Sequence, residues 1–251
     1  MALFSLLSGN GSAGFYDNES RKIELNGRII DTSPSFVLEP GDIIKVKGEE
    51  LVVTPFSTVR IGEIVKRKTQ IIQPWDAAYS IKVLSLKPGM RVLESGGGSG
   101  AMSSHILEAI GDSGSLVTVE ENSSNCDSLL SLRSFLQMEK NWEIVNSRIE
   151  DFRSGDKFDS AMLDLPEPWQ AAESMKKILK PGAIVCTYLP TFNQVERAHN
   201  AFLKSGFYVL ECSEILRRRI LVREGATRPD NDIIGHTAFL SFFVKCSGLR
   251  Y

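Results

Sequence analysis

The amino-acid sequence predicts an α/β protein with an open, mainly parallel sheet and a small β domain before it. Two observations predict this fold. Short β-rich segments separated by turn signals fill residues 21–69, and from residue 70 onward helical segments alternate with short apolar runs bounded by Gly and Pro. The second pattern is typical of parallel strands joined by crossover helices.

The chain begins with about twenty residues rich in Gly, Ser and Asn, and we expect residues 1–20 to form a flexible arm. Residues 21–69 form the predicted β domain, because Asn26-Gly27, the Pro40-Gly41-Asp42 stretch and Gly48 separate short β-rich segments. The predicted strands cover residues 22–30, 35–38, 42–47 and 50–54.

Residues 70–251 form the predicted α/β domain, which follows the basic run Lys66–Lys68. Its periodicity predicts helices over 75–84, from the Gly-rich loop to about Gly111, and over 126–138, 170–179 and 194–204. Strands are predicted over 91–94, 116–120, 144–146, 160–164 and 184–188. The domain ends in three further predicted strands, over 208–216, 218–222 and 238–245, with no helix among them. This ending predicts an antiparallel element at one side of the sheet.

Composition excludes several classes of protein. Of the 251 residues, 42% are hydrophobic and 24% charged, which is globular composition. The 29 Lys and Arg residues against 31 Asp and Glu residues give a net charge of −2, so nucleic-acid binding would depend on local basic patches. The candidate patches are Lys45 with Lys47, Lys66–Lys68, and Arg217, Arg218 and Arg219 with Arg223 and Arg228.

No stretch approaches the roughly 20 apolar residues that cross a bilayer, and the N-terminus lacks the features of a signal peptide. We therefore expect a cytoplasmic protein without membrane contact. The cysteines Cys126, Cys186, Cys212 and Cys246 are dispersed, without a CxxC pair or a nearby histidine cluster. The sequence therefore predicts neither a metal site nor a disulfide framework.

A glycine-rich loop joins the strand over 91–94 to the following helix. Gly96, Gly98, Ser99 and Gly100 allow a tight turn and a close approach of the backbone to a ligand at the helix N-terminus. The spacing fits either a dinucleotide or S-adenosylmethionine. Glu94 favours S-adenosylmethionine, because a carboxylate there would repel a pyrophosphate but attract an ammonium group. A tight turn without a ligand is the less favoured interpretation.

Two further positions concern the cofactor. Glu120 ends the next strand, where its carboxylate can accept hydrogen bonds from ribose hydroxyls, and the neighbouring Glu121 is the alternative. Many methyltransferases place an Asp after the following strand to bind the adenine amino group, but this chain has Arg148 there. The adenine contact therefore stays open between a wall formed by Ile149 and the carboxylates of Glu150 and Asp151.

The segment Asp164–Trp169, with the sequence DLPEPW, ends a predicted strand and opens a helix. The carboxyl ends of parallel strands meet at one edge of a sheet, so Asp164 is expected beside the glycine loop and Glu120. A purely structural turn is the alternative.

The chain resembles the tRNA (adenine-N1)-methyltransferases of the bacterial and archaeal TrmI type. Five ordered segments carry the resemblance: Gln70-Ile71-Ile72-x-Pro74-x-Asp76, the Val92–Gly100 loop, Asp164–Trp169, Tyr188-x-Pro190-x-x-x-Gln194-Val195, and Gly235–Leu240. Two positions depart from the pattern of the family. Gln73 replaces the usual Tyr, which removes an aromatic ring that could stack on the target base, and Trp75 replaces a Lys.

The resemblance implies a Rossmann-like class I methyltransferase domain that uses S-adenosylmethionine to methylate N1 of a T-loop adenosine of tRNA, of the position 58 type and possibly also at 57. It implies a homotetramer, with Asp164 as the catalytic residue. Gln194, His236, Arg217, Arg218 and Arg219 are the expected substrate-binding residues. The alternatives are a non-catalytic tRNA-binding subunit, and a methyltransferase acting on another RNA site or on a small molecule.

Overall fold

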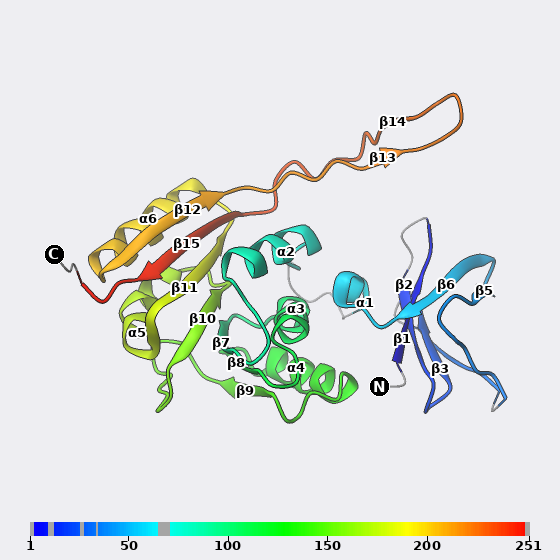
Figure 1. Cartoon of the computed structure of the whole chain (residues 1–251), viewed down its shortest axis with the longest axis horizontal. Coiled ribbons are helices and arrows are strands. Elements are labelled where there is room, and N and C mark those ends of the chain that lie inside the picture. The colour runs from blue at the N-terminus through cyan, green and yellow to red at the C-terminus, as the bar shows by residue number, and fades with distance from the viewer. Residues whose placement is uncertain (1–2, 10–12, 26–27, 34, 65–70, 249–251) are drawn as a thin grey trace.

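A computed structural model describes residues 3–9, 13–25, 28–33, 35–64 and 71–248 of the chain (Figure 1). It contains a six-stranded β domain and a larger α/β domain built on a seven-stranded sheet. A two-stranded arm extends from the α/β domain toward the side on which the β domain lies (Figure 1).

The β domain is an antiparallel sheet with the strand order β4-β3-β2-β1-β6-β5. Side chains on one face of the sheet form the core of this domain. The opposite face is also buried at Leu3 and Phe15, which pack in the cluster of the α/β domain. Leu6, Tyr16, Leu51 and Val53 are completely buried. The strands are β1 (Leu3–Leu7), β2 (Ala13–Asp17), β3 (Lys22–Leu25), β4 (Arg28–Asp31), β5 (Ile43–Val46) and β6 (Glu49–Pro55).

The predicted flexible arm over residues 1–20 is wrong for the part that the structure describes. β1 lies inside the sheet, paired antiparallel with β2 on one side and with β6 on the other. Leu6 and Tyr16 of this segment are completely buried in the core of the β domain, whereas Leu3 and Phe15 pack in the cluster of the α/β domain. Residues 3–7 and 13–17 of this segment form two paired strands, and residues 10–12 lie outside the described residues.

The predicted strand over 35–38 is also absent from the described structure. Hydrogen bonds from side chains hold this segment, which does not pair with a neighbouring strand of the described structure. The Phe36 carbonyl oxygen accepts hydrogen bonds from the Tyr16 hydroxyl at 2.6 Å and from Arg21 Nη1 at 3.0 Å.

The segment that follows β6 makes one of the contacts between the β domain and the α/β domain, and the packing of Phe15 against Phe135 makes another. This segment forms the short helices η1 (Thr58–Arg60) and α1 (Ile61–Ile64). The Thr58 hydroxyl hydrogen-bonds to His105 Nδ1 at 2.8 Å and to the Glu108 carboxylate, both on helix α3 (Ala101–Ile110). The predicted domain boundary at residue 69 and the basic run Lys66–Lys68 lie outside the described residues.

The α/β domain has the predicted class I methyltransferase architecture. Its strand order is β12-β15-β11-β10-β7-β8-β9, with five parallel strands from β11 to β9 and with β15 antiparallel to both of its neighbours. The strands are β7 (Arg91–Ser95), β8 (Ser115–Glu120), β9 (Trp142–Asn146), β10 (Phe158–Leu163), β11 (Leu179–Leu189), β12 (Phe207–Ser213) and β15 (Phe239–Lys245).

Helices cover both faces of this sheet because successive strand residues point to opposite sides. Val92 and Met162 pack in the cluster that contains α2 (Pro74–Val83), α3 (Ala101–Ile110) and α4 (Ser123–Phe135). Leu93 and Leu163 pack in the cluster that contains α5 (Ala172–Ile178) and α6 (Phe192–Lys204). A short 3₁₀ helix, η2 (Pro168–Ala171), precedes α5.

The arm leaves the sheet between β12 and β15 (Figure 1). It contains the short pair β13 (Ile220–Leu221) and β14 (Arg228–Pro229), so only two residues of the predicted strand over 218–222 are in β structure. Within the part of the chain that the structure describes, no helix has the length and apolar character needed to span a membrane.

Candidate active site

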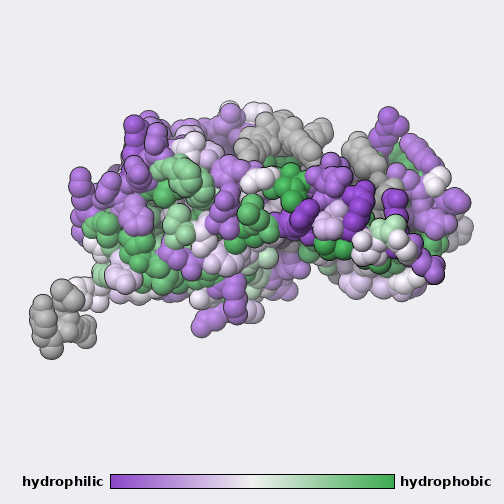
Figure 2. Space-filling model, turned by 90° about the horizontal axis from the view of Figure 1, so that it is seen from above, coloured by the Kyte–Doolittle hydropathy of each residue, from purple (hydrophilic) through white to green (hydrophobic). Residues whose placement is uncertain are grey.

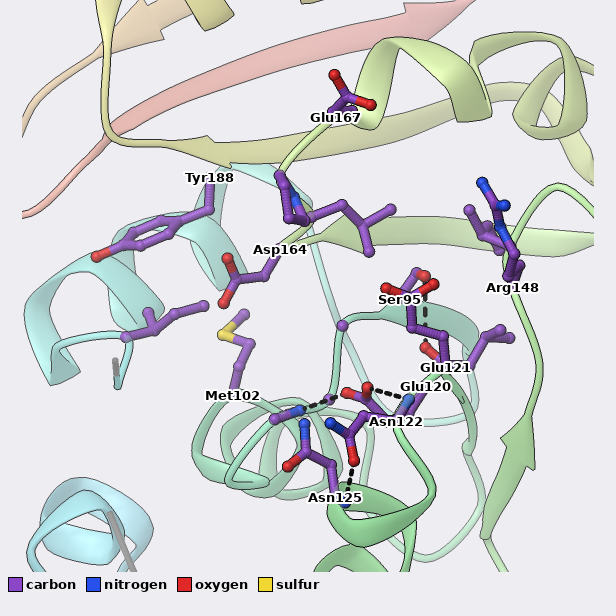
Figure 3. A pocket seen from close by; sticks show the side chains of 18 of the residues that line it. Ser95, Met102, Glu120, Glu121, Asn122, Asn125, Arg148, Asp164, Glu167 and Tyr188 are labelled. Carbon is purple, nitrogen blue, oxygen red and sulfur yellow. Dashed lines mark hydrogen bonds between the residues drawn. The ribbon is translucent and has the colours of Figure 1, made fainter. Parts of the chain in front are cut away.

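A cavity of about 620 Å³ opens at the carboxyl edge of the parallel strands (Figure 3). Residues that follow β7, β8, β9, β10 and β11 all contribute to its lining, as expected for an α/β sheet. Of the predicted site residues, it brings together Gly96, Gly98, Ser99, Glu120, Asp164 and Gln194. Gly100 and Glu94 are not among the lining residues.

The glycine loop requires glycine at two positions with positive φ. At Gly96, with φ of 84°, an added Cβ would collide with the Asp164 main-chain carbonyl oxygen. At Gly100, with φ of 81°, it would collide with the Leu132 side chain. Gly100 is the N-cap residue of α3, so the loop presents the start of this helix to the cavity.

Glu120 lines the cavity, and its carboxylate is held by the main chain on both oxygens. Oε2 accepts from Gly98 N at 3.0 Å, and Oε1 accepts from Asn122 N at 2.9 Å. Asn122 also lines the cavity and caps α4, because its side-chain oxygen accepts from Ser124 N and Asn125 N. Glu120 is therefore prearranged, and each carboxylate oxygen retains capacity for a further hydrogen bond.

Glu94 does not line the cavity. Its carboxylate is 1% exposed, and Oε2 accepts hydrogen bonds from Ser103 Oγ at 2.5 Å and Thr118 Oγ1 at 2.7 Å. Burial raises the pKa of Glu94 to about 7, although both hydrogen bonds oppose this shift. These bonds link β7 to α3 and β8, and the contact with a cofactor ammonium group stays a prediction.

Asp164 follows β10, and its carboxylate points toward the side chains of Tyr188 and Met102 (Figure 3). Its main-chain N–H donates to the Ser95 carbonyl oxygen at 2.9 Å, which ties the residue to the end of β7. Burial raises the pKa of Asp164 to about 7, and the negative charge of Glu120 contributes to the same shift. A carboxyl group with a raised pKa in a cavity is a candidate functional group.

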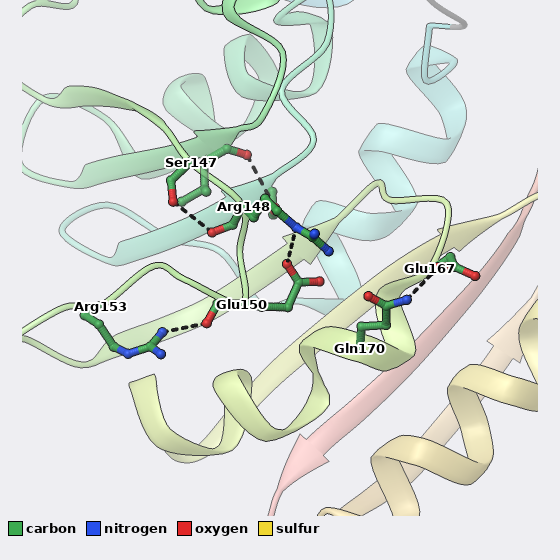
Figure 4. Close-up of polar contacts among 8 residues, drawn as sticks. Ser147, Arg148, Glu150, Arg153, Glu167 and Gln170 are labelled. Carbon is green, nitrogen blue, oxygen red and sulfur yellow. Dashed lines mark hydrogen bonds and ion pairs between the residues drawn. The ribbon is translucent and has the colours of Figure 1, made fainter.

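The segment that follows β9 forms another wall of the cavity. Ser147, Arg148, Ile149 and Glu150 line it, and Ile149 is 3% exposed. Arg148 Nε lies 3.3 Å from Glu150 Oε2, so the residue at the usual Asp position is paired with a nearby carboxylate (Figure 4). Asp151 is absent from this lining, which leaves Glu150 as the carboxylate of this segment at the cavity.

Gln194 and His236 stabilise the rim of the cavity. Gln194 Nε2 donates to the Pro166 carbonyl oxygen at 3.0 Å and so binds α6 to the turn that follows Asp164. His236 lies outside the lining, 2.8 Å from the Pro190 carbonyl oxygen through Nε2 and 2.5 Å from Glu214 Oε1 through Nδ1. Both acceptors raise the pKa of His236.

The three arginines of the arm are exposed and do not line the cavity. They also do not form one cluster. The Arg217 guanidinium lies 5.2 Å from the centre of the Trp75 ring on α2, whereas Arg219 Nη2 donates to the Gly9 carbonyl oxygen of the β domain at 3.1 Å. The arm thus contacts both domains.

Several lining residues were not predicted as site residues. Tyr188, Met102, Asn122 and Thr237 line the cavity although their residue types carry no strong functional signal by themselves. Tyr188 and Thr237 do belong to two of the motifs that carry the family resemblance. Their positions, at the end of one strand and just before the start of another, were the signal in the sequence that could have identified them as site residues. Among the described residues, no group of three His, Cys, Asp or Glu residues is arranged to hold a metal ion.

Comparison with known proteins gives consistent results. Residues 62–233 match the family model described as tRNA methyltransferase complex GCD14 subunit. The chain is 32% identical over 204 residues to the tRNA (adenine(58)-N(1))-methyltransferase TrmI of Thermus thermophilus, and the match covers 80% of each protein.

Two solved structures share the whole architecture. The tRNA (m1A58) methyltransferase TrmI of Aquifex aeolicus superposes with a TM-score of 0.79 at 27% identity, covering 98% of this chain and 97% of that one. A SAM-dependent O-methyltransferase of Thermotoga maritima gives a TM-score of 0.83 at 25% identity, covering 99% and 94% of the two chains. The fold is common to these proteins, all of which are named methyltransferases, and the Thermotoga maritima protein is named as SAM-dependent.

Proposed function

The chain belongs to the GCD14 family of tRNA methyltransferase subunits, and we propose that it transfers a methyl group from S-adenosylmethionine to N1 of a T-loop adenosine in tRNA. One observation carries the proposal. Asp164 lies with its carboxylate in the same cavity as the glycine loop and Glu120. A group suited to bind a base therefore lies next to groups suited to bind the cofactor.

The residues of the cavity fit S-adenosylmethionine. The volume of about 620 Å³ is in the range of small-molecule sites. The absence of a side chain at Gly96 lets the glycine loop pack directly against the Asp164 main chain, which brings the two parts of the site together. Glu120 would accept hydrogen bonds from the ribose hydroxyls. Ile149 would contact the adenine ring, and Glu150 would accept from its amino group in place of the usual Asp.

When bound, S-adenosylmethionine supplies an electrophilic methyl group on a sulfonium sulfur. Adenine N1 has an in-plane lone pair and carries no proton in the neutral base, so the reaction needs alignment more than a strong general base. Residues that hold N1 in line with the methyl–sulfur bond can lower the barrier by several kcal/mol.

Asp164 is proposed to provide this alignment. Its carboxylate would accept a hydrogen bond from the exocyclic amino group of the target adenine, which fixes the ring. It would also offset the positive charge that develops on the ring during transfer. This role requires the ionised carboxylate, and the raised pKa of Asp164 makes its ionisation sensitive to pH near neutrality.

Substrate binding is proposed to involve the arm. The exposed arginines there, Arg217, Arg218 and Arg219, would contact phosphates of the tRNA. Because the net charge of the protein is −2, attraction of a polyanion must come from such a local group of positive charges. Gln194 and His236 would act on the substrate through the rim that they hold. The target base must leave its stack to enter the cavity, and phosphate contacts would offset this cost of a few kcal/mol.

A homotetramer is proposed as the assembled form. The arm exposes Leu216, Ile220 and Val222, the last at 79%, and such apolar residues on an extended segment are suited to pack against another copy. Figure 2 views the molecule from above and shows green, apolar areas between purple, polar ones on this upper face. Sedimentation would measure the assembly. The cytoplasmic location of the protein stays a prediction.

The direct test is nucleoside mass spectrometry of a tRNA transcript incubated with the protein and isotopically labelled S-adenosylmethionine. We expect one labelled product, 1-methyladenosine, which disappears when the T-loop adenosine is replaced in the transcript. Labelled methyl groups found only on a ribose or on a small-molecule hydroxyl would instead favour an O-methyltransferase. Calorimetry should detect S-adenosylmethionine binding and no NAD binding.

A further inference from the structure

Asp76 is a completely buried carboxylate that contacts the wall of the cavity from behind. It is 0% exposed, and its Oδ2 accepts a hydrogen bond from the Tyr188 hydroxyl at 3.1 Å. Its second oxygen, Oδ1, makes no hydrogen bond of standard geometry among the described residues, and the Thr237 hydroxyl is its nearby polar group. A buried carboxylate that is only partly satisfied is costly, so its presence needs an explanation.

A role in starting helix α2 does not explain this burial. Asp76 is the third residue of α2, where an acidic side chain stabilises a helix N-terminus while remaining in water. The chain has such a residue in Glu173, which is exposed in the first turn of α5. Asp76 instead turns inward and contacts a residue 112 positions away.

The partner of Asp76 forms part of the site. Tyr188 is 6% exposed and lines the cavity near the end of β11. Its ring lies beside the Asp164 carboxylate, on the side of the cavity away from Glu120 (Figure 3). A target base that reaches Asp164 would therefore meet this ring.

We propose that Asp76 is a positioning residue for methyl transfer, which holds the Tyr188 hydroxyl and so fixes the tyrosine ring as the wall beside Asp164. The proposal rests on the proposed function, because the base that the ring would orient is the adenine of tRNA. A buried tyrosine hydroxyl needs a partner, and without Asp76 the ring would lose its anchor. Misplacement of an aligning group by a fraction of an ångström slows such a reaction.

The surroundings of Asp76 decide which substitutions are informative. Tyr188 and Thr237 are its polar neighbours, and the charged groups nearby are Glu214 and His236. Asparagine keeps an oxygen that can accept from Tyr188, and its amide nitrogen can donate to the neighbouring Thr237 hydroxyl oxygen. Alanine removes the acceptor altogether. If Asp76 acts through this hydrogen bond, the asparagine variant should retain the rate of methyl transfer and the alanine variant should lose it.

The test measures kcat, KM for tRNA and the Kd of S-adenosylmethionine in the full-length protein. We expect Asp76→Asn to retain kcat within about threefold, and Asp76→Ala to lower it by about tenfold or more. Tyr188→Phe should lower kcat to a similar degree. Because Asp76 acts through Tyr188, adding Asp76→Ala to Tyr188→Phe should cause little further loss. The Kd of the cofactor should change less than about threefold in all of them.

Glu173→Ala is the matched control, since it removes a first-turn carboxylate without a contact to the cavity, and it should leave kcat unchanged. Wild-type kcat in Asp76→Ala, equal losses in Asp76→Asn and Asp76→Ala, or additive losses in the double variant would overturn the inference. If thermal unfolding shows that Asp76→Ala does not fold, wild-type kcat in Tyr188→Phe would overturn it. Failure of the wild type to form 1-methyladenosine would instead refute the proposed function.

Discussion

Asp164 and Glu120 line one cavity, and the negative charge of Glu120 adds to the burial that raises the pKa of Asp164 to about 7. Glu120 is fixed by hydrogen bonds from Gly98 N and Asn122 N, so its charge stays at the site. The residue proposed to hold the ribose thus affects the ionisation of the residue proposed to hold the base. This relationship gives the activity a defined dependence on pH.

The rate of methyl transfer should rise with pH through about 7, because the ionised form of Asp164 accepts the hydrogen bond and offsets the charge on the base. Removing the charge of Glu120 should lower the pKa of Asp164, so Glu120→Gln should move the midpoint of the kcat profile to lower pH. The measurement is kcat against pH at saturating S-adenosylmethionine for both proteins. Superimposable midpoints would show that the two carboxyl groups are not coupled.

The stability of the protein should also depend on the ionisation of Glu94. Burial raises its pKa from 4.5 to about 7, so between these values the folded protein binds a proton that the unfolded chain releases. Stability should therefore fall as pH rises through this window, by about 3 kcal/mol at most for a shift of this size. Well above pH 7, the folded protein bears the full cost of burying the ionised Glu94 carboxylate.

Glu94→Gln cannot ionise, and its carbonyl oxygen can still accept from Ser103 and Thr118. It should lose less stability than the wild type between pH 5 and pH 8. Urea unfolding at several pH values measures the difference between the two slopes. Parallel profiles would show that Glu94 titrates similarly in the folded and unfolded chains.

Binding of tRNA should depend on salt and on the arm. Replacing Arg217, Arg218 and Arg219 by Ala should weaken tRNA binding and lower the slope of log affinity against log salt by about one for each lost phosphate contact. Affinity for S-adenosylmethionine should not change, because none of the three lines the cavity. Filter binding at several salt concentrations gives the slope.

Lys176, Lys177 and Lys204 provide a matched control for that experiment. All three are exposed and lie at the C-terminal ends of α5 and α6, away from the arm. Replacing them by Ala removes the same number of positive charges. Equal effects of the two triple variants would mean that net charge, and not the arm, determines tRNA affinity.

The sequence was most informative about residues whose position in the fold follows from the order of the parallel strands. The alternation of strands and helices predicted the sheet, and the rule that parallel strands end at one edge predicted that Glu120, Asp164 and the glycine loop would share a cavity. Local patterns were less informative in the β domain. The segment that suggested a flexible arm contains β1 and β2, because Gly, Ser and Asn also occur between the strands of a hairpin.

Contacts between distant residues could not be predicted. The hydrogen bond between Tyr188 and Asp76 joins residues from different motifs, and neither motif specifies the direction of the side chains. Similarly, the spacing that placed Glu94 beside the glycine loop did not reveal that its carboxylate points away from the cavity toward Ser103 and Thr118. Such orientations depend on packing in three dimensions.

The central claim is that Asp164 holds the target adenine for methylation at N1. The most direct measurement compares the rate of 1-methyladenosine formation in a tRNA transcript by the wild type and by Asp164→Ala, with calorimetry of S-adenosylmethionine for both. The account predicts that the variant keeps its cofactor affinity within a few-fold and loses at least about a hundredfold in rate. A variant that binds the cofactor normally and methylates N1 at a near wild-type rate would contradict it.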